Sequence, residues 1–154
     1  MNYHNITKCD MLNGDGLRVV LWVAGCSHHC DGCHNQITWS INSGLPFTSE
    51  VKTELFEALA KPYIKGLTLS GGDPFHVENR NVVRQLLREV KKTFGPEKDV
   101  WVYTGYCIED LPIKLLRNVD VLVDGKFVKE LADPLYNWAG STNQRVIRLA
   151  SKFS

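Results

Sequence analysis

The sequence predicts an α/β fold, an incomplete β/α barrel that occupies residues 1–154 as a single domain. Short apolar and β-branched runs alternate along the chain with segments of helical period, which is typical of a parallel sheet covered by helices. No low-complexity linker or internal repeat divides the chain. Its 154 residues suffice for one core, but a closed eight-stranded barrel takes about 250. We therefore expect part of such a barrel.

The first half of the chain predicts two strands and the helix between them. Residues 17–23, LRVVLWV, form the first strand and lead into a glycine and a group of cysteines. Thr48 is the expected N-cap of the helix and Pro62 ends it. The apolar face of this helix consists of Val51, Leu55, Phe56 and Leu59. The second strand, residues 66–70, stops at Gly71 and Gly72.

The second half continues the same alternation. A helix is expected from residue 79 or 81 to residue 94, where a Gly-Pro pair stops it. Its common face consists of Val82, Val83, Leu86, Leu87 and Val90. Residues 100–103 form the third strand, residues 108–117 a shorter helix, residues 119–123 the fourth strand and residues 144–149 a last strand. Ligands of parallel sheets bind beyond the carboxyl ends of the strands, so GCSHHC, SGGDP, TGY and VDGK should meet there.

Composition and charge exclude several classes of function. The chain has eighteen basic and seventeen acidic residues, and no segment of it is a block of basic residues. Nucleic acid is therefore not an expected partner. The N-terminus has no charged and apolar leader, and the longest apolar run, residues 19–24, is far too short for a membrane span. We expect a cytoplasmic protein. Its five cysteines, an odd number without secretory context, favour metal binding or catalysis over disulfides.

The stretch GCSHHCDGCHNQITW, residues 25–39, carries the strongest chemical signal. Cys26, Cys30 and Cys33 fall within eight residues, and such short spacings let three sulfurs hold one small metal cluster. A structural zinc site needs a fourth ligand. That ligand could be His28, His29 or His34, or distant Cys9 or Cys107. An iron–sulfur cube has the same shortage, and three cysteines leave one iron open for chemistry.

The spacing C-x-x-x-C-x-x-C directly after the first strand resembles the signature of the radical S-adenosylmethionine superfamily. Further segments resemble one family, the activating proteins of the anaerobic, class III ribonucleotide reductases, which are glycyl-radical-enzyme activases. These segments are NGDGLR, GCHNQITW, SGGDP, WVYTGY, VLVDGKF and W-x-G-S-x-N-Q at residues 138–144. They occur in the order of that family and cover the chain nearly end to end. Two positions depart from the superfamily: Gly32 replaces a usual aromatic residue and Asp73 a usual Glu.

The resemblance implies a partial barrel of the radical S-adenosylmethionine type and a [4Fe–4S] cluster held by Cys26, Cys30 and Cys33. S-adenosylmethionine would chelate the fourth iron and be cleaved reductively to methionine and a 5′-deoxyadenosyl radical. That radical would generate the glycyl radical of the large chain of the anaerobic ribonucleotide reductase. A flavodoxin-like electron donor is also implied, whereas no catalytic residue beyond the cluster ligands is expected.

The expected cofactor-binding residues fall in the same segments. They are Gly32, Cys33, His34, Gly71, Gly72, Asp73, Thr104, Asp124 and Lys126. Residues 32–34 would contact the adenine, and Gly71 and Gly72 would let the backbone approach a ligand closely. Asp73 would accept a hydrogen bond from the methionine ammonium. The other three residues would contact the ribose and the carboxylate.

Two other functions stay open. The protein could activate another glycyl-radical enzyme or act on a small molecule, although such activases tend to be longer and carry extra cysteine clusters. It could also be a zinc or electron-transfer module without catalysis. In that case SGGDP is ordinary turn chemistry, and Thr104, Asp124 and Lys126 are solvated loop residues. Cys9 and Cys107 are expected to be small buried or idle thiols.

Overall fold

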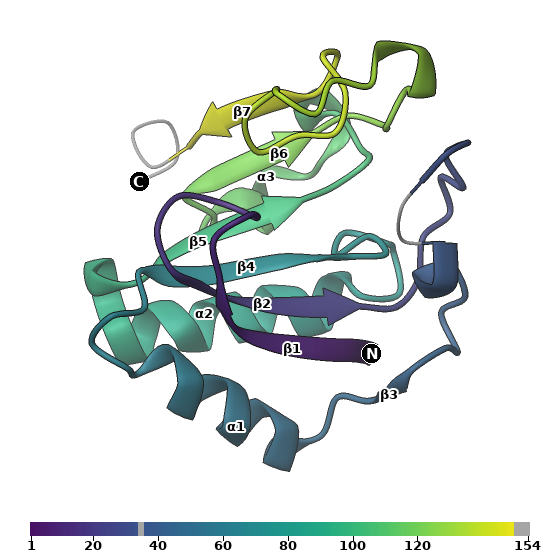
Figure 1. The fold of residues 1–154 in the computed structure, drawn as a ribbon. Coiled ribbons are helices and arrows are strands. Elements are labelled where there is room, and N and C mark those ends of the chain that lie inside the picture. The colour runs from purple at the N-terminus through teal and green to yellow at the C-terminus, as the bar shows by residue number, and fades with distance from the viewer. Residues whose placement is uncertain (34–35, 150–154) are drawn as a thin grey trace.

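The computed structural model describes residues 1–33 and 36–149, in which seven strands form one mixed sheet of order β3-β1-β2-β4-β5-β6-β7 (Figure 1). The central strands, which run parallel, are β2 (Arg18–Val23), β4 (Gly66–Gly71), β5 (Asp99–Tyr103) and β6 (Val121–Asp124). The outer strands β1 (Asn2–Asp10), β3 (Leu45–Pro46) and β7 (Arg145–Arg148) each pair antiparallel with a neighbour. The prediction of an α/β fold is confirmed.

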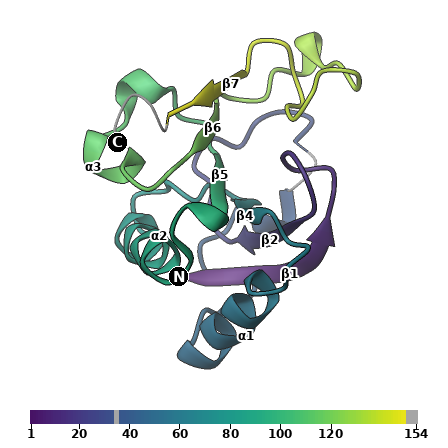
Figure 2. The same ribbon diagram turned by 90° about the vertical axis from the view of Figure 1, so that its left-hand side faces the viewer.

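Three helices lie on the outer side of the curved sheet (Figure 2). They are α1 (Ser49–Leu59), α2 (Arg80–Phe94) and α3 (Ile113–Leu116). The core lies between these helices and the alternate strand residues that point toward them, such as Leu21, Leu69 and Val102. None of the helices in the described residues has the length and apolar character needed to cross a bilayer.

The helix signals in the sequence are largely confirmed. The Thr48 side chain caps α1 by accepting a hydrogen bond of 3.3 Å from the backbone N–H of Val51. The predicted face of α2 is buried except at one position: Val82 is 37% exposed. A residue next to Val83 is rotated by about 100° around the helix axis. Val82 therefore lies beside the buried stripe and not in it.

Two features of the fold differ from the sequence-based expectation. The single helix expected over residues 108–117 is wrong, because the chain forms a 3-10 turn, Ile108–Asp110, and then the short helix α3. Pro112 separates the two pieces: it lacks an N–H, and the preceding Leu111 is extended, with φ −101° and ψ 135°. Strand β1 was not expected, since its sequence NYHNITKCD is mostly half-buried and has no apolar run.

The other face of the sheet is filled at the amino ends of the strands. Arg18 is fully buried there, with its guanidinium 5.4 Å from the Trp101 ring and 2.7 Å from the Asp99 carboxylate. It also donates a 2.7 Å hydrogen bond to the Thr68 hydroxyl. Trp101 packs edge-on against Trp138 from the long segment before β7. Because these side chains fill the space at the amino ends, a ligand site is expected at the opposite, carboxyl ends of the strands.

Candidate functional site

One cavity is lined by residues that follow each of the four parallel strands. It lies at the carboxyl ends of β2 and β4, where the chain after β2 runs out beyond the arrowhead in Figure 1. Its walls include Cys26, Cys30 and Cys33 after β2, Gly72 and Asp73 after β4, Thr104 and Gly105 after β5, and Gly125 and Phe127 after β6. Trp39, Tyr103 and Gln144 also line it.

The segment that carries the cysteines is closed at its base by two backbone hydrogen bonds. The N–H of Gly25 donates to Thr38 O at 2.7 Å, and the N–H of Cys26 donates to Trp39 O at 2.9 Å. A turn within the segment follows from the 3.1 Å hydrogen bond between the N–H of Cys33 and Cys30 O. We call residues 25–39 the cysteine loop. Its two ends are held together beside the end of β2.

All five cysteines are thiols, but they differ in exposure. Cys26, Cys30 and Cys33 are half-buried, whereas Cys9 and Cys107 are exposed, so the expectation that these two could be buried is wrong. Burial raises the pKa of the Cys26 thiol, and hydrogen bonds from the backbone of His28 and His29 oppose this effect. The three cysteines of the loop are thus the thiols that share one cavity.

One buried polar group of a residue that lines this cavity indicates that it suits an occupant. Trp39 lines the cavity, and its indole nitrogen is buried and has no hydrogen-bond partner among the described residues. Unpaired buried donors are costly and rare. An occupant with sulfur, oxygen or nitrogen acceptors could pair this donor, and three thiols are a soft ligand set suited to iron–sulfur clusters. The residues present therefore fit such a cluster.

Gly71 and Gly72 allow a close approach between two stretches of backbone. A Cβ on Gly71, whose φ is +102°, would lie 2.7 Å from Val23 N and O. A Cβ on Gly72 would lie 2.6 Å from Gly25 O. The N–H groups of Gly72 and Asp73 donate to Val23 O and Gly25 O at 2.8 and 2.6 Å. Glycine is required here because the β4 turn packs on the base of the cysteine loop.

Asp73 is the centre of a buried hydrogen-bond network. Its side chain is 1% exposed. One carboxylate oxygen, Oδ1, accepts from the Phe75 N–H at 2.9 Å and the Thr104 hydroxyl at 2.8 Å. The other, Oδ2, accepts from the Gly105 N–H at 3.0 Å and lies 2.6 Å from His28 Nε2. Its role with the methionine ammonium stays a prediction.

The other predicted cofactor residues are spread over two places. Thr104 lines the cysteine cavity, but its hydroxyl donates to Asp73. Asp124 and exposed Lys126 line a neighbouring pocket that shares His28, Gly105 and Gly125 with the cavity. Gly32 is half-buried, with φ +74°. His34 lies outside the described residues.

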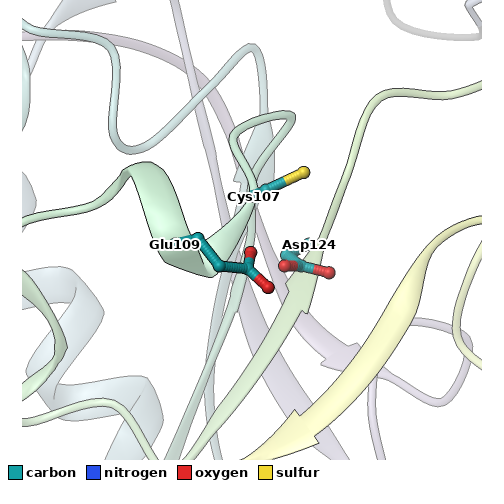
Figure 3. A group of neighbouring side chains, drawn as sticks. All are labelled: Cys107, Glu109 and Asp124. Atoms are coloured by element: carbon teal, nitrogen blue, oxygen red, sulfur yellow. The ribbon is translucent and has the colours of Figure 1, made fainter.

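The neighbouring pocket contains a group of three side chains with metal-binding atoms. Ligand atoms of Cys107, Glu109 and Asp124 lie within 4.8 Å of one another (Figure 3). Arg145 already fills the position of a cation: it donates to both oxygens of Glu109 at 2.9 and 2.8 Å and to both oxygens of Asp124 at 3.0 and 2.6 Å. Asp124 is fully buried, so this guanidinium neutralises its charge. We interpret the group as a structural ion pair.

Sequence reasoning missed the residue that holds the last wall of the cavity. Gln144 accepts hydrogen bonds from the N–H groups of Gly140 and Ser141 at 2.9 and 3.0 Å and donates to Gly125 O at 3.0 Å. The motif W-x-G-S-x-N-Q was its only signal. Arg145 had no signal of its own, and Trp39 lies in the segment GCHNQITW, which assigned it no role.

Comparison with known proteins shows the family of this chain. Residues 12–147 match a family described as a 4Fe-4S single cluster domain. An anaerobic ribonucleoside-triphosphate reductase-activating protein of Enterobacteria phage T4 is 48% identical over 147 residues, which cover 95% of this chain and 93% of the phage protein. Proteins of the same description from Vibrio cholerae and Escherichia coli K12 are 48% and 44% identical, over 96% and 97% of this chain and 98% and 99% of their own lengths. This chain therefore belongs to the family of the anaerobic ribonucleoside-triphosphate reductase-activating proteins.

Proposed function

We propose that this protein activates an anaerobic ribonucleotide reductase by generating a glycyl radical in its large chain. The observation that carries the proposal is the cavity in which Cys26, Cys30 and Cys33 meet the ends of all four parallel strands. The full-length similarity to reductase-activating proteins supports the partner.

The residues of the cavity divide into ligands and supports. Cys26, Cys30 and Cys33 would hold a [4Fe–4S] cluster and leave one iron for S-adenosylmethionine. When bound, the two groups would supply the chemistry, the one-electron reductive cleavage of S-adenosylmethionine to methionine and a 5′-deoxyadenosyl radical that would take the α-hydrogen of the target glycine. Trp39 would donate a hydrogen bond from its indole nitrogen to the occupant of the cavity. The protein itself orients these groups and limits access of water.

The shape of the sheet suits a protein substrate. We interpret the curved sheet with its outer helices (Figure 2) as a partial barrel of the radical S-adenosylmethionine type. A barrel that does not close leaves a lateral opening wide enough for a loop of another protein. A flavodoxin-like protein is the electron donor that the family resemblance implies.

Radical transfer to the reductase tests the proposal directly. With a reductant and S-adenosylmethionine under anaerobic conditions, the protein should form a long-lived carbon-centred radical on the reductase chain. Its paramagnetic resonance doublet should collapse when the α-position of glycine is deuterated. Normal cofactor cleavage with a diamagnetic reductase would reject this partner and favour another glycyl-radical enzyme.

Metal analysis separates the cluster from a zinc module. After anaerobic reconstitution we expect about four iron per chain and a brown colour. Single replacement of Cys30 by Ala should abolish stable cluster binding, whereas Cys107→Ala, the exposed control, should leave the iron content unchanged. One zinc and no colour would contradict the proposal.

A further inference from the structure

The cysteine loop and the β4 turn are joined by a buried side chain to which neither motif assigns a role. His28 stands between the first two cysteines of the loop, and its side chain is 7% exposed. Its Nε2 lies 2.6 Å from Asp73 Oδ2. Its ring packs edge-on against Tyr106, with ring centres 4.6 Å apart and planes at 74°. One side chain from the loop after β2 thus contacts segments after β4 and after β5.

Gly105 provides the space for this ring. A Cβ at Gly105 would lie 2.5, 2.7 and 2.8 Å from three atoms of the His28 ring. Gly105 is not among the glycines with positive φ, so backbone conformation does not require glycine here. The His28 ring therefore explains why residue 105 is a glycine: a larger side chain would clash with the ring.

Asp73 forms hydrogen bonds with the cysteine loop on both sides of Cys26. Before this cysteine, Gly25 O accepts a 2.6 Å hydrogen bond from the Asp73 N–H. After it, His28 reaches the Asp73 carboxylate. The first predicted cluster ligand therefore stands between two attachments to the residue predicted to bind the cofactor ammonium.

We propose that His28 is a positioning residue that fixes the cysteine loop against Asp73, and so sets the cluster relative to the S-adenosylmethionine site. This inference rests on the proposed function. The carboxylate contact uses Nε2 alone, so a ligand role would have to use Nδ1, and the iron content of the His28 variants tests that alternative. Its loss should leave the three thiols able to hold iron but should disturb how the cofactor meets the open iron.

The test compares His28→Ala with His28→Gln, whose amide nitrogen can replace Nε2 as a donor to Asp73. His4→Ala is the matched control, since His4 makes a comparable 2.7 Å hydrogen bond to Ser43 in a part of the chain outside the cavity. Iron content, affinity for S-adenosylmethionine and the change that S-adenosylmethionine causes in the paramagnetic resonance spectrum of the reduced cluster are measured without the reductase. His28→Ala should keep its iron, bind S-adenosylmethionine about tenfold more weakly because the cysteine loop is no longer fixed against Asp73, and show an altered spectral change. His28→Gln and His4→Ala should resemble the wild type.

Gly105→Ala provides an independent test, because it displaces the ring while His28 itself is retained. It should reproduce the weaker cofactor binding of His28→Ala, and it keeps the proposal falsifiable if His28→Ala fails to fold. Loss of iron in both His28 variants would make His28 a ligand and overturn the proposal. Unchanged affinity and spectrum in His28→Ala, or equal impairment in His28→Gln, would also overturn it. A wild-type protein that binds iron but not S-adenosylmethionine would instead refute the proposed function, and with it this inference.

Discussion

Replacement of Asp73 by Ala should lower the stability of the fold even when no ligand is bound. The carboxylate is 1% exposed and accepts hydrogen bonds from the N–H groups of Phe75 and Gly105, from the Thr104 hydroxyl and from His28. The hydroxyl and the imidazole can turn toward other partners, but the two backbone N–H groups cannot. At about 1–3 kcal/mol for each donor left unpaired, the free energy of unfolding should fall by about 2–6 kcal/mol. That is a large share of the 5–15 kcal/mol, in rough terms, of an ordinary domain.

Urea unfolding of the reduced, metal-free protein, followed by circular dichroism, measures this change. Asp73→Asn keeps one acceptor oxygen and should lose about half as much stability as Asp73→Ala. Asp31→Ala, at an exposed aspartate of the cysteine loop, is the matched control and should change stability by less than about 0.5 kcal/mol. If Asp73→Ala unfolds at the wild-type urea concentration while S-adenosylmethionine binding is lost, the carboxylate serves the cofactor and not the fold.

Three further outcomes follow from the packing and the ion pairs. Gly72→Ala should lower stability by about 1–3 kcal/mol, read from a thermal melt, because the new Cβ would meet the backbone of Gly25; an unchanged melting temperature would contradict this. Arg145→Met should cost about 1–3 kcal/mol in urea unfolding, since buried Asp124 loses a partner that is itself 47% exposed; a gain in stability would argue against the structural ion pair. Lys52→Met, at an exposed salt bridge, should change stability by less than about 0.5 kcal/mol in the same assay, and a larger loss would show that this bridge is stronger than its exposure suggests.

The elements that the sequence predicts well are those in which burial follows a simple period. Strands β2, β4, β5 and β6 are buried on both faces and read as continuous apolar runs. Helix α2 shows its stripe because its outer face is charged. Strand β1 has no such run, because most of its residues are only half-buried. Its position in the sheet depends on pairing with β2 and β3, which its own sequence does not report. Pro112 was a local signal that overrode the apolar period of residues 108–117.

The site is predictable only to the extent that it is local in sequence. Cys26, Cys30 and Cys33 are found from their spacing, because one short loop carries all three. The contact between His28 and Asp73 joins residues 45 positions apart, and its existence depends on the turn that Gly71 and Gly72 allow. No pattern in one segment reports such a contact.

The order of the strands explains how so short a chain can surround one cavity. Strands β2, β4, β5 and β6 lie side by side in chain order, so each successive parallel strand adds one wall at the same edge. Strand β7 runs antiparallel to β6, and Asp124 at the end of β6 is paired with Arg145 at the start of β7. An antiparallel strand begins where its partner ends, and this brings Gln144 back to the cavity without another helix. The antiparallel edge strand β7 thus completes the wall of the cavity. A closed barrel would use further β/α units for this purpose.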